Sequence, residues 1–254
     1  MFNSKIKMLI NLANKIIINI LKKCLQIIRK GGIHTWPSFS YEIWVLIQFT
    51  LMNERPDKLV EFGSGRSTHY LAEYSQKCNK LLYSIEQNFM YLLRNWIGLR
   101  CSFIKNFHLV FVPIKGDWFD IKKLKKIKGL KNADFLLIDG PGGALNKGLR
   151  NSQSGLNFLK EYYPYSTTII IDDLQREAIK NFTKDFISHR TELYFLLLKY
   201  RVNTYNPMKN LILFCVKKEN KDKYLQFMGF TKIDKSLVFH SENCDDLFKF
   251  LKQR

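Results

Sequence analysis

The stretch KLVEFGSGRSTHYLAE, Lys58 to Glu73, joins an apolar run to a glycine turn and then to a helical pattern. A short apolar run that ends at a glycine is typical of a buried β-strand. In a doubly wound α/β fold, the ligand lies at the carboxyl end of such a strand. Glycines in the turn let the backbone bend sharply and approach that ligand closely. The stretch therefore predicts both a fold and the place of its site.

The same alternation of apolar runs and helical patterns continues along the chain. Strands are predicted at residues 59–62, 81–85, 108–112, 135–138, 168–171, 194–198 and 211–216. Helices are predicted at residues 66–76, 89–100, 154–161 and 174–188. Strands that are apolar on both faces and separated by helices indicate a parallel sheet covered on both sides.

We therefore predict an α/β chain with three parts. Residues 1–57 hold N-terminal helices, residues 58–218 form the core, and residues 219–254 are a C-terminal appendage. The core is expected to be a Rossmann-like, doubly wound, mostly parallel seven-stranded sheet with helices on both faces.

The chain of 254 residues carries a formal net charge of +19. This charge suits an anionic partner, such as nucleic acid or a membrane surface, but a lysine-rich composition of the whole chain is the alternative. The lysine-rich run at residues 121–131 is either a solvated helix face or an anion-binding patch. The five cysteines include no Cys-x-x-Cys, which argues against a zinc site and favours a reducing, cytoplasmic location.

Residues 5–30 form a basic amphipathic pattern in which lysine, asparagine, glutamine or arginine recurs at helical spacing. These polar residues interrupt the stretch too often for a transmembrane span, which needs about 20 apolar residues. A basic amphipathic helix can lie on an anionic membrane, here the inner face. The alternative is that its apolar face packs on the core or on another subunit.

The residues of the glycine turn distinguish between nucleotide-like ligands. A dinucleotide turn reads Gly-x-Gly-x-x-Gly, but Thr68 stands at the third glycine position here. Glu61, two residues before Gly63, would repel a pyrophosphate and attract a cation. Glu86 ends the next predicted strand, about where a carboxylate binds ribose hydroxyls in such folds. S-adenosylmethionine meets these requirements, because it has a sulfonium, an ammonium and a ribose but no phosphate.

VEFGSGRST with the following SIE resembles motif I and the next acidic strand end of class I S-adenosylmethionine-dependent methyltransferases. The resemblance spans about residues 59–216. It implies that S-adenosylmethionine is the cofactor, with Ser67 at the third small position of the motif. The residues to which it assigns cofactor binding are Glu61, Gly63, Ser64, Gly65, Ser67, Thr68 and Glu86. Asp117 and Trp118 are candidates for the adenine side, although a surface turn with a buried tryptophan would explain them equally well.

Carboxylates also end the fourth and fifth predicted strands, in LLIDGPGG and TTIIIDDLQRE. Asp139, Asp172 and Asp173 should meet at the same rim as the glycine turn, where like charges favour a cation between them. This layout resembles the metal-dependent O-methyltransferases of the catechol and caffeoyl-CoA types, which implies Mg²⁺ or another divalent cation on these three residues. The GPGG after Asp139 departs from that subset. Alternatively, one of the paired aspartates caps the next helix.

The predicted function is therefore S-adenosylmethionine-dependent O-methylation of a small hydroxyl compound or a glycan, with Asp139 and Asp172 as catalytic residues. A metal would activate the acceptor hydroxyl; without one, Asp139 would act as the base. His69 follows the glycine turn and is more often a packed residue than a catalytic one. The alternative function is a nucleic-acid-binding methyltransferase-like module, either an RNA methyltransferase or catalytically silent, with Lys122 to Lys131 on phosphates. A nicotinamide oxidoreductase is disfavoured by Glu61, and the oligomeric state is left open.

Overall fold

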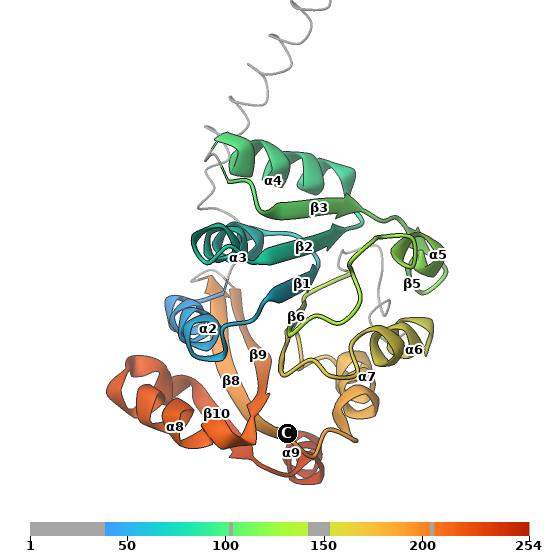
Figure 1. Cartoon of the computed structure of the whole chain (residues 1–254). Helices are drawn as coiled ribbons and strands as arrows, with labels where there is room; N and C mark the ends of the chain where they lie inside the picture. Colours follow the sequence, from blue (N-terminus) through green and yellow to red (C-terminus); the bar gives the residue numbers. More distant parts are fainter. Residues whose placement is uncertain (1–38, 102–103, 142–152, 204–205, 254) are drawn as a thin grey trace, which may run out of the picture. The chain divides into compact units, whose positions relative to one another are not determined.

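The computed structural model describes residues 39–101, 104–141, 153–203 and 206–253. The chain divides into two compact units, Met1–Pro37 and Ser38–Arg254, and all described residues belong to the second (Figure 1). The predictions for residues 5–30 therefore lie outside the described residues. The described helices include none with the length and hydropathy that a bilayer-spanning segment requires.

Helices and strands alternate along the second unit, as the sequence predicts. Its strands are β1 (Lys58–Phe62), β2 (Leu81–Glu86), β3 (Phe107–Phe111), β4 (Ile114–Lys115), β5 (Trp118–Phe119), β6 (Phe135–Ile138), β7 (Thr168–Ile171), β8 (Leu193–Asn203), β9 (Asn206–Lys217) and β10 (Leu237–Ser241). Its α-helices are α2 (Tyr41–Glu54), α3 (Arg66–Lys77), α4 (Phe89–Cys101), α5 (Ile121–Leu124), α6 (Gln153–Tyr162), α7 (Glu177–Ile187), α8 (Lys221–Phe230) and α9 (Cys244–Lys252). Two short 3₁₀ helices, η2 (Lys218–Asn220) and η3 (Lys232–Ser236), flank α8.

The main sheet has the strand order β10-β8-β9-β7-β6-β1-β2-β3. The pairs from β7 to β3 are parallel, whereas β9 runs antiparallel to both β7 and β8. This confirms the predicted doubly wound, mostly parallel sheet, with eight strands rather than seven. The chain moves from β1 outward to β3 and then returns to β6 on the other side of β1. The turn after β1 therefore lies at the switch point where doubly wound folds bind ligands.

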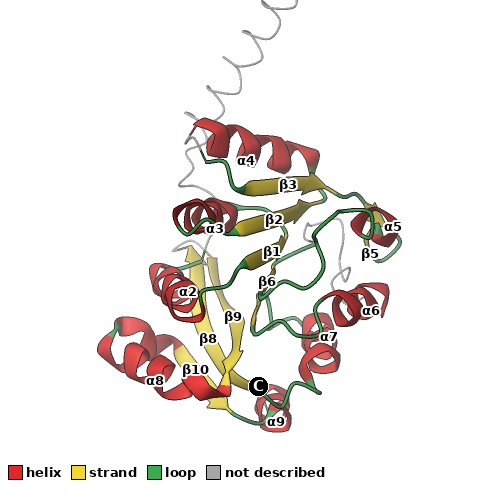
Figure 2. Ribbon diagram, viewed as in Figure 1, coloured by secondary structure: helices red, strands yellow, loops and turns green. Residues whose placement is uncertain are grey.

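Helices cover both faces of this sheet (Figure 2). Helices α2, α3, α4 and α8 lie on one face, and α5, α6, α7 and α9 lie on the other. Because successive side chains of a strand point to opposite faces, each strand contributes to two apolar cores. In β1, Leu59 is buried on the α2 side and Val60 on the α6 side.

Two parts of the chain differ from the predicted elements. The helix predicted at residues 174–188 begins only at Glu177, because the Leu174 N–H donates to the Leu211 carbonyl at 2.9 Å and ties this segment to β9. The residues 219–254 form β10, which pairs antiparallel with β8 as the eighth strand, and α9, whose Leu247 is buried in the α6-side core.

Candidate functional site

The glycine turn after β1 uses its two glycines for different purposes. Gly63 has a φ of +96°, and a Cβ atom there would lie 2.8 Å from the carbonyl carbon of Asp139. Gly140 approaches from the other side, where its Cβ would lie 2.7 Å from the Gly63 Cα. Gly65 is different: its backbone is extended, and the nearest atom to an added Cβ would be the Ser67 Oγ at 3.9 Å. Gly63 is therefore required by the fold, whereas no described residue fills the space beside Gly65.

Glu61 lies beneath this turn with no exposed surface. Its Oε2 accepts hydrogen bonds from the Thr68 hydroxyl at 2.7 Å and the Ser84 hydroxyl at 2.5 Å. The Thr68 oxygen in turn accepts the Gly65 N–H at 2.9 Å, which fixes the turn to the carboxylate. The Glu61 Oε1, however, is buried without a hydrogen-bond partner among the described residues. A buried carboxylate oxygen normally has a partner, so this atom marks a place for a donor from a ligand.

The surroundings of Glu61 disfavour its charged form. Burial raises the pKa of Glu61 to about 7, and the negative charge of Asp139 acts in the same direction. The hydroxyls of Ser67, Ser84 and Thr68 lower this pKa but do not offset the burial. A cation placed at the Oε1 would favour the carboxylate and lower its pKa again. The site is therefore suited to a positively charged ligand group.

Glu86, at the end of β2, lies beside the same turn and is 2% exposed. The Ser64 N–H and hydroxyl donate to its Oε2 at 2.8 and 2.9 Å, and the Asn88 N–H donates to its Oε1 at 2.6 Å. Burial raises the pKa of Glu86, and these hydrogen bonds lower it in part. Glu86 is therefore held at the end of β2 by donors from the glycine turn and from the residues that follow the strand.

Sequence analysis missed two residues of this site, Ser84 and Asn95. Ser84 is the register partner of Glu61 on the neighbouring strand and the one polar residue between Leu81 and Ile85, a signal that could have been used once the strands were aligned. The Asn95 amide, on α4, donates to the Ser64 hydroxyl at 3.0 Å and so supports the Glu86 contact. No local sequence signal identifies Asn95.

His69 packs in the interface of α3 and α4. Its Nε2 lies 3.2 Å from the Asn95 Oδ1, and its ring lies against Gly98, where an added Cβ would be 2.7 Å from the Cε1. Burial lowers the pKa of His69, so the ring is neutral at physiological pH. This environment is that of a packed histidine that supports Asn95.

The two candidates for the adenine side, Asp117 and Trp118, differ in burial. Asp117 is exposed, and its Oδ1 accepts a hydrogen bond from the Ser154 hydroxyl at 2.8 Å. Trp118 is 1% exposed and packs in the core with its ring centroid 5.2 Å from that of Phe62. A Cβ on Gly155 would lie 2.6 Å from this indole. Trp118 is thus in the environment that the alternative interpretation, a buried tryptophan, describes.

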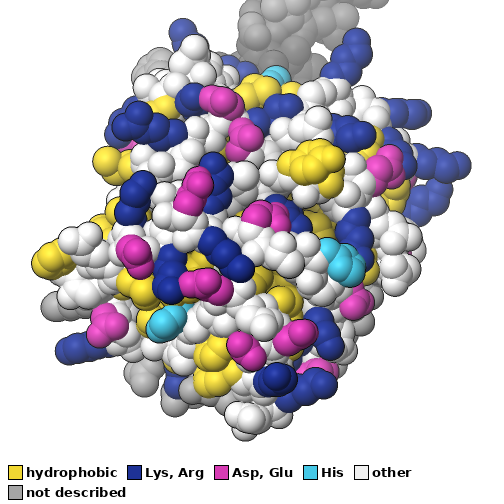
Figure 3. All heavy atoms as spheres, turned by 60° about the horizontal axis from the view of Figure 1, so that its bottom comes forward, with side chains coloured by type: hydrophobic (Ala, Val, Ile, Leu, Met, Phe, Trp, Pro, Cys, Tyr) yellow, Lys and Arg dark blue, Asp and Glu magenta, His cyan; other side chains and the backbone are white. Residues whose placement is uncertain are grey.

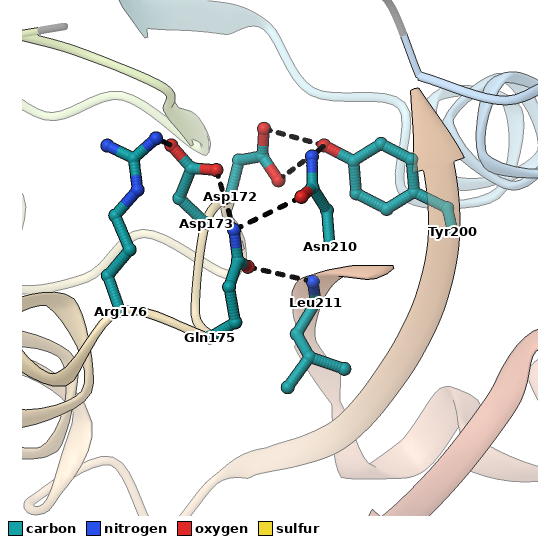
Figure 4. A network of polar contacts seen from close by, with 7 residues as sticks. All are labelled: Asp172, Asp173, Gln175, Arg176, Tyr200, Asn210 and Leu211. Atoms are coloured by element: carbon teal, nitrogen blue, oxygen red, sulfur yellow. Dashed lines mark hydrogen bonds and ion pairs between the residues drawn. The ribbon is translucent and has the colours of Figure 1, made fainter. Parts of the chain in front are cut away.

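The paired carboxylates that follow β7 are held by protein side chains (Figure 4). Both oxygens of Asp172 accept the Tyr200 hydroxyl, at 2.7 and 2.8 Å. Asp173 has a φ of +61° and contacts Arg176 at 3.0 Å between its Oδ2 and the guanidinium Nη2. Neither aspartate lies at the N-cap of α7, which is Arg176, so the alternative interpretation of a helix cap is wrong. Tyr200, which the sequence analysis did not single out, belongs to the site.

These contacts do not fit the predicted metal site. Within the described part of the chain, no group of three or more His, Cys, Asp or Glu side chains is placed to hold a metal ion. Asp139 is half-buried, and its charge raises the pKa values of both Glu61 and Tyr200, so it lies within electrostatic range of both ends of the rim. The described carboxylates of the rim are therefore not arranged as a divalent ion requires.

The fold is that of solved O-methyltransferases, although the sequence matches no protein-family model and no curated protein. The O-methyltransferase from Bacillus cereus, solved in complex with S-adenosylhomocysteine, is 15% identical with a TM-score of 0.55 over 78% of this chain and 90% of that chain. TomG from Streptomyces achromogenes, an O-methyltransferase of tomaymycin synthesis solved with S-adenosylmethionine, is 13% identical with a TM-score of 0.52 over 78% of this chain and 88% of that chain. At these identities, the similarity establishes the Rossmann-like methyltransferase fold.

Proposed function

We propose that this chain is an S-adenosylmethionine-dependent methyltransferase that transfers the methyl group to a hydroxyl of a small molecule or a glycan. The observation that carries the proposal is the Glu61 Oε1, a buried carboxylate oxygen without a hydrogen-bond partner among the described residues, beneath a glycine turn. Such an atom suits a cationic ligand and disfavours a pyrophosphate. The fold shared with O-methyltransferases supports the same reaction class.

The residues of the turn fit the methionine part of this cofactor. Glu61 would accept a hydrogen bond from its ammonium, and the open space at Gly65 would admit its chain. Glu86 would accept a ribose hydroxyl, because it ends β2 beside the turn, about where a carboxylate binds ribose in α/β nucleotide folds. Ser64 and Thr68 hold these two carboxylates through their hydroxyls.

The chemistry needs a correctly placed acceptor more than a strong catalytic group. When bound, the cofactor supplies a methyl group on a sulfonium; the acceptor oxygen attacks the methyl carbon in line, and the sulfur leaves as a thioether. The chain's part is to hold the acceptor oxygen on that line and to remove its proton. Asp139 is the candidate base, because its backbone packs directly against the glycine turn at Gly63. Asp172 is the second carboxylate on the acceptor side.

Calorimetric titration with S-adenosylhomocysteine and with NAD tests this function. The homocysteine product retains the ammonium and ribose but carries no phosphate, so it should bind at one site per chain. NAD should not bind, because its pyrophosphate would meet Glu61. Binding of NAD alone would contradict the proposal and favour an oxidoreductase.

A second candidate function uses the lysines between residues 122 and 131 for binding nucleic acid. All six of these lysines are exposed, while Leu124 and Leu130 on the same segment are buried. The segment of residues 122–131 is typical of a solvated face, but its lysines also present cations that phosphates can reach. Phosphate contacts release counterions, so affinity for a single-stranded RNA should fall steeply between about 50 and 200 mM salt. Salt-independent or absent binding would exclude this candidate.

A further inference from the structure

Polar side chains form a network at the ends of β7, β8 and β9. One backbone N–H shows which atom donates in each of its hydrogen bonds. The Leu211 N–H can only donate, and its acceptor is the Gln175 Oε1 at 2.9 Å. The Gln175 amide nitrogen must therefore face the other way. It donates to the Asp173 Oδ1 at 3.0 Å and to the Asn210 Oδ1 at 3.2 Å. Both hydrogens and the oxygen of this amide are thus used within the protein.

The same reasoning assigns the Tyr200 proton. The Asn210 oxygen accepts from Gln175, so the Asn210 nitrogen faces the Tyr200 hydroxyl, at a long 3.5 Å. The hydroxyl oxygen is the acceptor on that side, and its single proton is left for Asp172. This proton is shared between the two Asp172 oxygens, at 2.7 and 2.8 Å. Figure 4 shows the chain of contacts from Leu211 to Asp172.

Asp173 is held by a second, separate partner. Its positive φ turns the side chain of Asp173 away from Asp172 and towards Arg176, whose guanidinium lies 3.0 Å from the Oδ2. Aspartate is among the residues that tolerate this backbone conformation best. Its other oxygen accepts from Gln175. The two neighbouring aspartates are therefore directed at two different protein donors.

We propose that Tyr200 and Arg176 replace a divalent cation at this rim, so that the site works without a metal. A Mg²⁺ ion needs near-octahedral oxygen ligands at about 2.0–2.1 Å. Asp172 and Asp173 would have to leave their donors and turn towards each other to supply them. Tyr200 is then a positioning residue that fixes Asp172, and Asp172 and Asp173 are not metal ligands. The inference rests on the proposed function only in regarding this rim as the acceptor side of the site.

Titration with MnCl₂ alone tests the proposal on the full chain. The wild-type protein should show no stoichiometric Mn²⁺ binding at millimolar concentration by calorimetry, and its melting temperature should be the same with MnCl₂ and with EDTA. Stoichiometric binding that disappears in Asp172→Asn would overturn the proposal. S-adenosylhomocysteine is titrated into the same wild-type samples. If it does not bind, the proposed function is refuted, and the Mn²⁺ result is then judged by itself.

Removal of the two protein donors provides the complementary test. In Tyr200→Phe/Arg176→Gln, Asp172 loses the Tyr200 hydroxyl, and Asp173 loses the Arg176 guanidinium but keeps Gln175. Mn²⁺ affinity should therefore rise at least tenfold above that of the wild type. A purely structural role of Tyr200 would change stability but not Mn²⁺ affinity. Tyr194→Phe is the matched control, because Tyr194 lies on the same strand and its hydroxyl contacts His240 at 2.7 Å instead of a carboxylate. If the double variant does not fold, Arg176→Gln alone, at an exposed side chain, should still raise Mn²⁺ affinity, and no rise would contradict the proposal.

Discussion

The buried carboxylate of Glu61 lowers the stability of the ligand-free protein when it is charged. Its pKa rises from 4.5 to about 7 on folding, so the folded chain binds more protons than the unfolded chain between these pH values. Stability from this group is therefore greatest below pH 4.5 and falls as the pH rises to 7. The difference amounts to about 3 kcal/mol at full ionisation. This cost is consistent with a residue retained for binding a cation.

The first prediction follows from this cost. Glu61→Gln should stabilise the ligand-free protein at pH 8 by up to about 3 kcal/mol, because the neutral amide removes the buried charge. The same variant should lose affinity for S-adenosylhomocysteine, because the amide does not attract the ammonium. Urea unfolding at pH 5 and pH 8, together with calorimetry, measures both effects.

Glu86→Gln is the control for that variant. Both oxygens of Glu86 accept protein donors, so an amide nitrogen would face an N–H or a hydroxyl in either orientation. This variant should therefore destabilise the protein by about 1–3 kcal/mol. If Glu61→Gln destabilises the chain equally at pH 8, Glu61 is a structural support of the turn and not a cation site.

The second prediction concerns the pH dependence of binding. Between pH 7 and about pH 5.5, affinity for S-adenosylhomocysteine should fall by up to tenfold per pH unit, since the ammonium requires the charged form of Glu61, whose pKa is about 7. Calorimetry in two buffers of different ionisation enthalpy should detect proton release on binding near pH 6. If the affinity of the wild type does not change with pH, the ammonium binds elsewhere. Glu61→Gln is the control, because its affinity should not depend on pH in this range.

Among the elements, the glycine turn between β1 and α3 separates folding from ligand binding. Gly63 has a positive φ and close backbone contacts, whereas Gly65 is extended and faces open space. The third prediction uses this contrast. Gly63→Ala should destabilise the protein by at least about 2 kcal/mol, through backbone strain and overlap with Asp139. Gly65→Val should cost no more than about 1 kcal/mol and yet lower S-adenosylhomocysteine affinity at least tenfold, since its side chain occupies the ligand space.

Thermal unfolding and calorimetry on both variants check this prediction. Gly65→Ala adds only one methyl group at the same position, so it should give a smaller loss of affinity than Gly65→Val. Unchanged affinity in Gly65→Val would remove Gly65 from the cofactor site while leaving the fold as described.

The elements that sequence predicts best are those whose signal is local. The run Leu59–Phe62 is apolar apart from Glu61 and ends at a glycine, and the structure places β1 and its turn there. Tyr200 and Asn210 carry no such signal, because their partners are 28 and 35 residues away in the chain. The pairing of β9 with both β7 and β8 brings them together. The metal prediction for Asp172 and Asp173 was made from the sequence without knowledge of these partners. Two adjacent acids suggest a shared ion until the left-handed backbone at Asp173 separates them.

Over the whole molecule, basic and acidic side chains are interspersed on the face that Figure 3 shows. Several charges among the described residues form partly exposed ion pairs, such as Lys221 with Glu242 at 2.6 Å. Exposed pairs contribute little to stability. Basic side chains are therefore not gathered into one patch on this face.

The fourth prediction assigns membrane attraction to residues 5–30, whose basic amphipathic pattern stays a sequence-based prediction. Deletion of residues 1–30 should abolish co-sedimentation with vesicles of anionic phospholipid and leave the unit Ser38–Arg254 soluble and folded. The full chain should bind anionic vesicles more strongly than zwitterionic ones, and the difference should shrink in high salt because the attraction is screened. Replacing Lys7, Lys15 and Lys22 by glutamine keeps the helical pattern and should weaken vesicle binding by itself. If the shortened chain instead aggregates, residues 1–30 cover apolar surface of the protein, and the membrane interpretation fails.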